Sequence, residues 1–198
     1  MRLIFLNLTK FLLDDLQKHK LVNFIFRLFL FILLILYGWH AIKVTHKGFG
    51  DPDIAFSFLH NVDLIFHEAG HMIFLSPVFG QFIHMLGGTI MQLLIPVTCM
   101  IVLLFKSRDP FGASVCFWWI GENFFDISVY MNDAERMWLP LLGGYHDWNY
   151  ILTVTGLLQY VHVMATTVFV CGICIMILSV LWGGLLLINN FKTIVRKN

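Results

Sequence analysis

Apolar residues fill five long runs of the chain, which short polar breaks separate. These runs cover residues 21–39, 54–78, 81–105, 111–131 and 150–190. Each of the first four has about the 20 residues that one helix needs to cross a bilayer. The last has about 40, enough for two spans or for one long helix preceded by a short half-helix. The pattern predicts an all-α integral membrane protein, a polytopic bundle of five to six transmembrane helices.

The first 20 residues show a different pattern, in which apolar and charged positions are interleaved. Leu3, Leu6 and Phe11 alternate with Lys10 and Asp14. This favours an amphipathic helix in the membrane interface over a cleaved signal peptide, because acidic residues follow the first apolar run. The predicted organisation is an interfacial helix (1–20), an anchor span and loop (21–53), a membrane core (54–133), a loop or lid (134–149) and C-terminal membrane helices (150–198).

Composition supports a membrane protein and excludes some partners. The 198 residues are 59% hydrophobic and 13% charged, too few charges for the surface of a soluble domain of this size. The net charge is +1 and there is no basic cluster, so we expect no nucleic-acid partner. We expect a multi-pass protein of the bacterial inner membrane whose partners are the lipid bilayer and a substrate.

The second apolar run carries the sequence His67-Glu68-x-x-His71. On a helix, the two histidines lie one turn apart on the same face, so both imidazoles can reach one ion. Glu68 is next to them and can contact a water on that ion as a general base. Ionisable groups at this depth in a membrane are unfavourable unless they have partners. The simpler alternative is a His-Glu hydrogen-bond network that only packs helices.

The fourth run has a polar stripe that could complete a zinc site. Asn123, Asp126, Tyr130 and Asp133 recur at helical spacing. A catalytic zinc takes three protein ligands, and a carboxylate is an acceptable third. Asp126 is the deepest acid of the stripe, so we expect it to be the third ligand and Asn123 to bind the substrate or an oxyanion. In the alternative interpretation, Asp126 and Glu122 only pair with nearby groups.

Other polar residues could support this site. Asp63, one turn before His67, could hold an imidazole N–H or face a wet cavity, and Gln92 could line the site or a substrate groove. In the loop at 134–149, we expect Asp147 or Asn149 to cap the next helix. His146 and Asp147 are the alternative third ligands if this loop folds over the site.

With these residues, the chain resembles the site-2 protease family of intramembrane zinc metalloproteases, as a divergent or minimal member. The resemblance covers about residues 54–133. It implies a helical membrane core, Zn²⁺ held by His67, His71 and Asp126, and Glu68 as the catalytic base. The segment that carries the third ligand in this family reads Asn-x-x-Pro-x-x-x-x-Asp-Gly, and here Asn123-x-x-Asp126 lacks the proline and the glycine.

The predicted function is therefore cleavage of a membrane-embedded or membrane-proximal peptide bond by zinc-activated water. Two alternatives stay open. One is a membrane zinc hydrolase that acts on a lipid or small amide, and the other is a non-enzymatic transporter or scaffold that has kept the motif.

Overall fold

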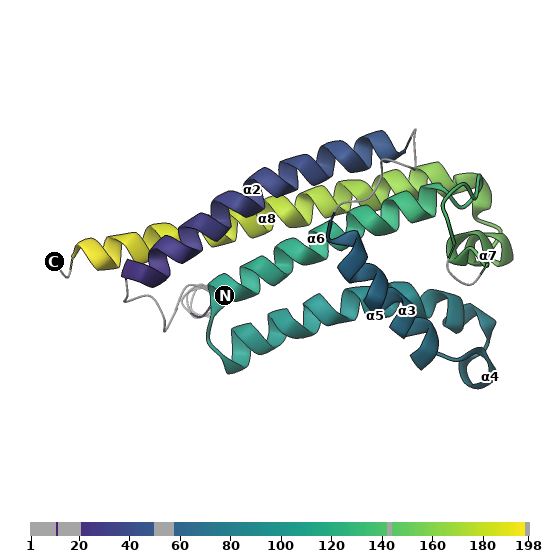
Figure 1. Ribbon diagram of the computed structural model, residues 1–198, viewed down its shortest axis with the longest axis horizontal. Coiled ribbons are helices and arrows are strands. Elements are labelled where there is room, and N and C mark those ends of the chain that lie inside the picture. The colour runs from purple at the N-terminus through teal and green to yellow at the C-terminus, as the bar shows by residue number, and fades with distance from the viewer. Residues whose placement is uncertain (1–10, 12–20, 50–57, 142–143, 197–198) are drawn as a thin grey trace, which may run out of the picture.

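The computed structural model describes residue 11 and residues 21–49, 58–141 and 144–196. The amphipathic helix expected over residues 1–20 lies outside this part of the chain, apart from residue 11. In the part described, all regular secondary structure is helical. Figure 1 shows α2, α5, α6 and α8 running along the long axis of the molecule, with α3 oblique to them and α7 near one end.

Three of the described helices are long and apolar enough to cross a membrane. They are α2 (Leu21–Gly48), α5 (Gln81–Ile101) with the π-helical turn Val102–Lys106, and the segment Leu158–Val195, which contains α8. Their side chains are largely exposed, as expected for helices that present apolar residues to lipid. The chain is thus consistent with a membrane protein.

The most enclosed helix is α6 (Pro110–Asn132), which packs most extensively against α8 (Val161–Val195). The two backbones meet at Gly121 and Gly172, where a Cβ on Gly121 would lie 2.9 Å from the carbonyl oxygen of Gly172. Small residues permit such an approach in membrane bundles. Because α6 is enclosed, its polar side chains face other protein groups: Glu122, Asn123, Asp126, Ser128 and Asn132 are all buried.

The run expected to be a second span is broken. Its described part forms α3 (His60–Ile73), which has 14 residues, and the short α4 (Ser76–Phe79) follows. Pro77 lies in the first turn of α4, and Gly80 has φ +81°, a conformation that glycine adopts readily, immediately before α5. The chain therefore reverses between α3 and α5, and α3 packs on α5.

The C-terminal apolar stretch forms a short helix followed by a long one. The short helix is α7 (Asp147–Val154), and a 3₁₀ turn (Leu158–Tyr160) leads into the 35 residues of α8. Of the two arrangements that the sequence allowed, the structure has the half-helix followed by one long helix. The start of α7 is thereby brought back beside α5 and α6.

Candidate metal centre

Three glycines allow α3 to approach α5 closely at the centre of the site. A Cβ on Gly70 would collide with the backbone of Gly87. A Cβ on Gly88 would lie 2.5 Å from His67 Nε2, inside van der Waals contact. The imidazole of His67 therefore lies directly over the backbone of α5, in space that only a glycine leaves open.

Both motif histidines have their Nδ1 atoms engaged by α5. His71 Nδ1 lies 2.8 Å from the backbone carbonyl oxygen of His84. His67 Nδ1 lies 3.3 Å from Gln92 Oε1. Both oxygens are acceptors, so each imidazole donates its Nδ1–H and a neutral ring presents a lone pair on Nε2. Such outer contacts fix the tautomer and ring orientation of metal-ligating histidines.

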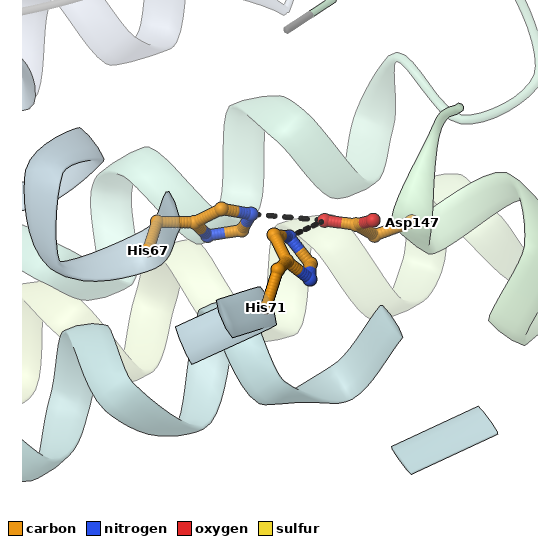
Figure 2. A group of neighbouring side chains, drawn as sticks. All are labelled: His67, His71 and Asp147. Carbon is orange, nitrogen blue, oxygen red and sulfur yellow. Dashed lines mark hydrogen bonds and ion pairs between the residues drawn. The ribbon is translucent and has the colours of Figure 1, made fainter. Parts of the chain in front are cut away.

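The two Nε2 atoms converge on one carboxylate oxygen. Figure 2 shows Asp147 pointing from the start of α7 towards both rings. Asp147 Oδ2 is 2.9 Å from His67 Nε2 and 3.2 Å from His71 Nε2. One ligand atom from each residue lies within 4.8 Å of the others, and this is the group of the described residues that could hold a metal ion.

The position of Asp147 follows from the start of α7. His146, not Asp147 or Asn149, occupies the N-cap, and its Nδ1 accepts the backbone N–H of Asn149 at 3.2 Å. The backbone N–H of Asp147 donates to the hydroxyl of Tyr130 on α6, 3.1 Å away. The carboxylate is therefore not used as a cap, contrary to one sequence-based expectation, and is held towards the histidines.

The charge of this group requires a positive partner. Burial alone would raise the pKa of Asp147, but hydrogen bonds to His67 and His71 outweigh burial and hold that pKa below its ordinary value. Those hydrogen bonds need an N–H at Nε2 of each ring, whereas rings whose only proton is on Nδ1 would turn two Nε2 lone pairs towards the ionised carboxylate. Three acceptors this close are unfavourable unless protons or a cation lie between them.

A cavity of about 410 Å³ opens beside this group. Glu68 is half-buried and lines it, together with His67, His71 and Asp147. Apolar side chains form much of the remaining wall: Leu64, Ile127, Leu139, Pro140 and Leu141. An apolar pocket with a few converging polar groups is typical of a binding or catalytic site.

The structure does not place Asp126, the expected third ligand, in the metal-binding group. Asp126 lines the cavity, but its Oδ2 lies 2.8 Å from Nδ1 of His60, a residue at the start of α3. Seven residues separate His60 from His67, about 10 Å along a helix. The reason is the position of Asp126 along α3. α6 places Asp126 beside the first turn of α3, whereas the motif histidines lie further along that helix.

Asp63 and Asn123, unlike Asp126, do not line the cavity. Asp63 is fully buried and accepts from the indole N–H of Trp119 at 2.9 Å, so Gln92 rather than Asp63 contacts His67. Asn123 is fully buried and its amide donates to the backbone oxygen of Trp119. The expectation that Asn123 binds a substrate therefore has no support in its position.

His146, the other alternative ligand, is turned away from the motif. Its ring stacks on Tyr130, with centroids 4.4 Å apart, and its Nε2 is 3.5 Å from Asp133 Oδ2. Two groups contribute to this site that were not assigned to it from the sequence. One is the backbone carbonyl of His84, a contact that local sequence does not reveal. The other is Tyr130, which the sequence indicated only as a member of the polar stripe. The Gly-Gly-Tyr-His-Asp-Trp segment at 143–148 was the signal for Asp147.

Comparison with known proteins identifies no relative. No family model, no curated protein and no solved structure matches the chain.

Proposed function

We propose that the chain is an intramembrane zinc metalloprotease, in which His67, His71 and Asp147 hold the zinc and Glu68 is the general base. The observation that carries this proposal is the convergence of two Nε2 atoms and one carboxylate oxygen on the wall of a cavity that Glu68 also lines. Two histidines and one carboxylate are a known ligand set of catalytic zinc sites, in which a fourth position stays open for water.

The spacing of the ligand atoms fits zinc. Ligands about 2.0–2.2 Å from a tetrahedral zinc are about 3.4 Å from one another. The two distances from Asp147 Oδ2 to the Nε2 atoms, 2.9 and 3.2 Å, are close to this value. Moving Asp147 Oδ2 a few tenths of an ångström away from the rings would bring both distances to this value, and the Nδ1 contacts already present the required nitrogen of each ring.

Each residue then has a defined part in the reaction. Zinc bound here would supply Lewis acidity and bring the pKa of water towards neutrality. Glu68 follows His67 on α3, lines the cavity and is positioned to take a proton from the attacking water and pass it to the leaving amine. Gln92 and the His84 carbonyl hold the ring orientations.

The substrate that we propose is a membrane protein or membrane-proximal peptide, because the apolar cavity wall adjoins helices suited to lipid. The same wall could accept an acyl chain, which keeps a zinc hydrolase of lipids or small amides as the second candidate. A transporter or scaffold that retains the motif is the third candidate, and it would need no general base at Glu68.

We also propose that the protein is multi-pass in the bacterial inner membrane, with α6 as a fourth, enclosed span among the three apolar helices. The 14 residues of α3 reach about 21 Å at 1.5 Å per residue, less than the ~30 Å of a bilayer core. For five or six spans, further segments would have to cross the membrane.

The resemblance to site-2 proteases is retained within this proposal, with one change. Asp147 takes the part of the acidic ligand that the motif comparison had given to Asp126. Because the acid would come from a segment after the fourth apolar run, we propose a divergent relative rather than a shortened copy of the family's usual arrangement.

The test is metal content joined to proteolysis in the detergent-purified protein. About one zinc per chain is expected in the unmutated protein and in Glu68→Gln, and none in His67→Ala or His71→Ala. Only the unmutated protein should cleave a library of membrane-segment peptides, with products identified by mass spectrometry. Zinc-free unmutated protein, or full cleavage by Glu68→Gln, would contradict the proposal; turnover of lipids or small amides alone would favour the second candidate.

A further inference from the structure

The hydroxyl of Tyr130 lies at the junction between the metal centre and the cavity. Tyr130 lines the cavity, and its ring meets that of His67 edge-on with centroids 5.9 Å apart. The Tyr130 ring also stacks on the ring of His146, which restrains its orientation. Its oxygen accepts the backbone N–H of Asp147, 3.1 Å away, so the hydroxyl is beside the residue that presents the third ligand.

That hydroxyl still has a donor to offer. A phenol has one O–H donor and can also accept, and the contact with Asp147 uses only its accepting capacity. Within the part of the chain that the structure describes, the Tyr130 O–H donates to no protein acceptor. Tyr130 is only partly buried, and it borders the cavity.

We propose that Tyr130 is a catalytic residue whose O–H donates a hydrogen bond to the substrate carbonyl oxygen as negative charge develops on it. This inference rests on the proposed function and adds the group that stabilises the oxyanion. A donor held by the ring stacking on His146 and by the Asp147 contact suits this task, because its orientation needs little rearrangement during the reaction. Asn123, the residue expected to do this, is buried, does not line the cavity and donates to the backbone oxygen of Trp119.

The step balances without transfer of the tyrosine proton. A water oxygen bonds to the carbonyl carbon while Glu68 takes one water proton, and the carbonyl oxygen gains negative charge that the Tyr130 O–H stabilises. The C–N bond then breaks, the carbonyl re-forms, and the proton on Glu68 passes to the leaving nitrogen. Tyr130 keeps its proton throughout and forms its strongest hydrogen bond at the charged stage.

The alternative is that Tyr130 only positions Asp147 through the backbone N–H. The chain offers a matched control for this possibility. The hydroxyl of Tyr37 on α2 accepts the backbone N–H of Leu59, also at 3.1 Å, and Tyr37 does not line the cavity. Tyr37→Phe therefore removes the same kind of contact without removing a donor from the site.

The experiment compares the unmutated protein, Tyr130→Phe and Tyr37→Phe in three measurements. The first is zinc affinity by competition with a chelator. The second is kcat and KM at saturating zinc on a peptide that the unmutated protein cleaves. The third is the calorimetric affinity for a phosphinic peptide of the cleaved sequence, whose tetrahedral phosphorus group carries charged oxygens where the oxyanion forms.

In Tyr130→Phe, we expect a modest fall in zinc affinity, because the Asp147 N–H loses its acceptor. At saturating zinc we expect an unchanged KM, with kcat and phosphinic-peptide affinity each lower by roughly 10²–10³-fold. Tyr37→Phe should match the unmutated protein in all three measurements. Unchanged kcat in Tyr130→Phe would overturn the inference, as would weaker zinc binding with activity restored by excess zinc, which indicates positioning alone. If the zinc-loaded unmutated protein cleaves nothing, the proposed function fails and the inference fails with it. This result is seen in the unmutated protein, whereas failure of the inference alone is seen only in Tyr130→Phe.

Discussion

Gln92 Oε1 lies 3.3 Å from His67 Nδ1, so an amide on α5 orients an imidazole on α3. Gln92 is buried, and the carbonyl of His84 on the same helix performs the corresponding task for His71. The tautomers of both motif histidines are thus set by α5, a helix that contributes no member of the His67, His71 and Asp147 group. The glycines at the α3–α5 contact make this possible, because they bring the two backbones close enough for these hydrogen bonds.

Removal of the Gln92 amide should weaken metal binding without removing a ligand. We expect Gln92→Leu to lower zinc affinity by about 10–100-fold, because His67 can then rotate or protonate at Nε2. Gln92→Glu keeps an acceptor at the same place and should retain most of the affinity. Chelator competition measures the effect, with Gln81→Leu at the exposed start of α5 as the control. Equal affinity in Gln92→Leu would show that the contact does not orient His67.

The third ligand can be identified by comparing two aspartates. Asp147→Asn should abolish stoichiometric zinc binding, because an amide oxygen lacks the charge that two neutral imidazoles and a divalent ion require. Asp126→Asn should retain zinc, because its carboxylate contacts His60, not the motif histidines. Metal content by mass spectrometry gives the answer directly. Zinc lost from Asp126→Asn and kept in Asp147→Asn would restore the assignment expected from sequence.

The space above Gly88 is a separate requirement of the proposed metal centre. The Cβ of Gly88→Ala would lie 2.5 Å from His67 Nε2, so the imidazole must leave its position. We expect loss of zinc together with ~1–3 kcal/mol of destabilisation from overpacking. Gly184→Ala is the control, because a Cβ there meets only Phe31 at 3.4 Å. Zinc content and thermal unfolding are measured together, so that loss of zinc from a folded protein can be distinguished from general unfolding. Full zinc content in Gly88→Ala would contradict the prediction.

Much of the helical framework could be predicted from local sequence. The expected runs at 21–39, 81–105 and 111–131 lie within α2, the α5 segment and α6, because length and apolar character are properties of each segment alone. His67 and His71 share a face because i and i+4 spacing suffices to place them. The run at 54–78 was misjudged as one span, since residues 74–80 interrupt it after Ile73.

The choice of Asp147 as the proposed third ligand depended on information that no single segment holds. Asp126 and Asp147 are both acids near the motif in space, and the choice depends on how far α6 is displaced along α3. That displacement places Asp126 beside His60 and leaves the motif histidines to Asp147, which arrives through the turn at the start of α7. These positions depend on contacts between helices far apart in the sequence, such as α7 on α5 and α6 on α8.

The junction between α2 and α6 should contribute to stability independently of the metal. Asp109 caps α6 by accepting the backbone N–H of Gly112, and its Oδ1 also lies 2.9 Å from Arg27 Nη2. The paired side chains are only 11% and 19% exposed, and the guanidinium lies 5.2 Å from the Phe111 ring centroid, so solvent screens this pair less than it screens an ordinary surface pair.

Asp109→Ala removes both the cap and the charge partner, and we expect a loss of ~1–3 kcal/mol in unfolding free energy. Asp109→Asn keeps a capping oxygen and should lose only part of this. Thermal unfolding in detergent measures the stability of both variants. Their zinc content should stay at the unmutated level, because Arg27 and Asp109 are far in sequence from the proposed metal ligands and do not contact them. If Asp109→Asn is as unstable as Asp109→Ala, the charge pair rather than the cap holds α2 to the start of α6.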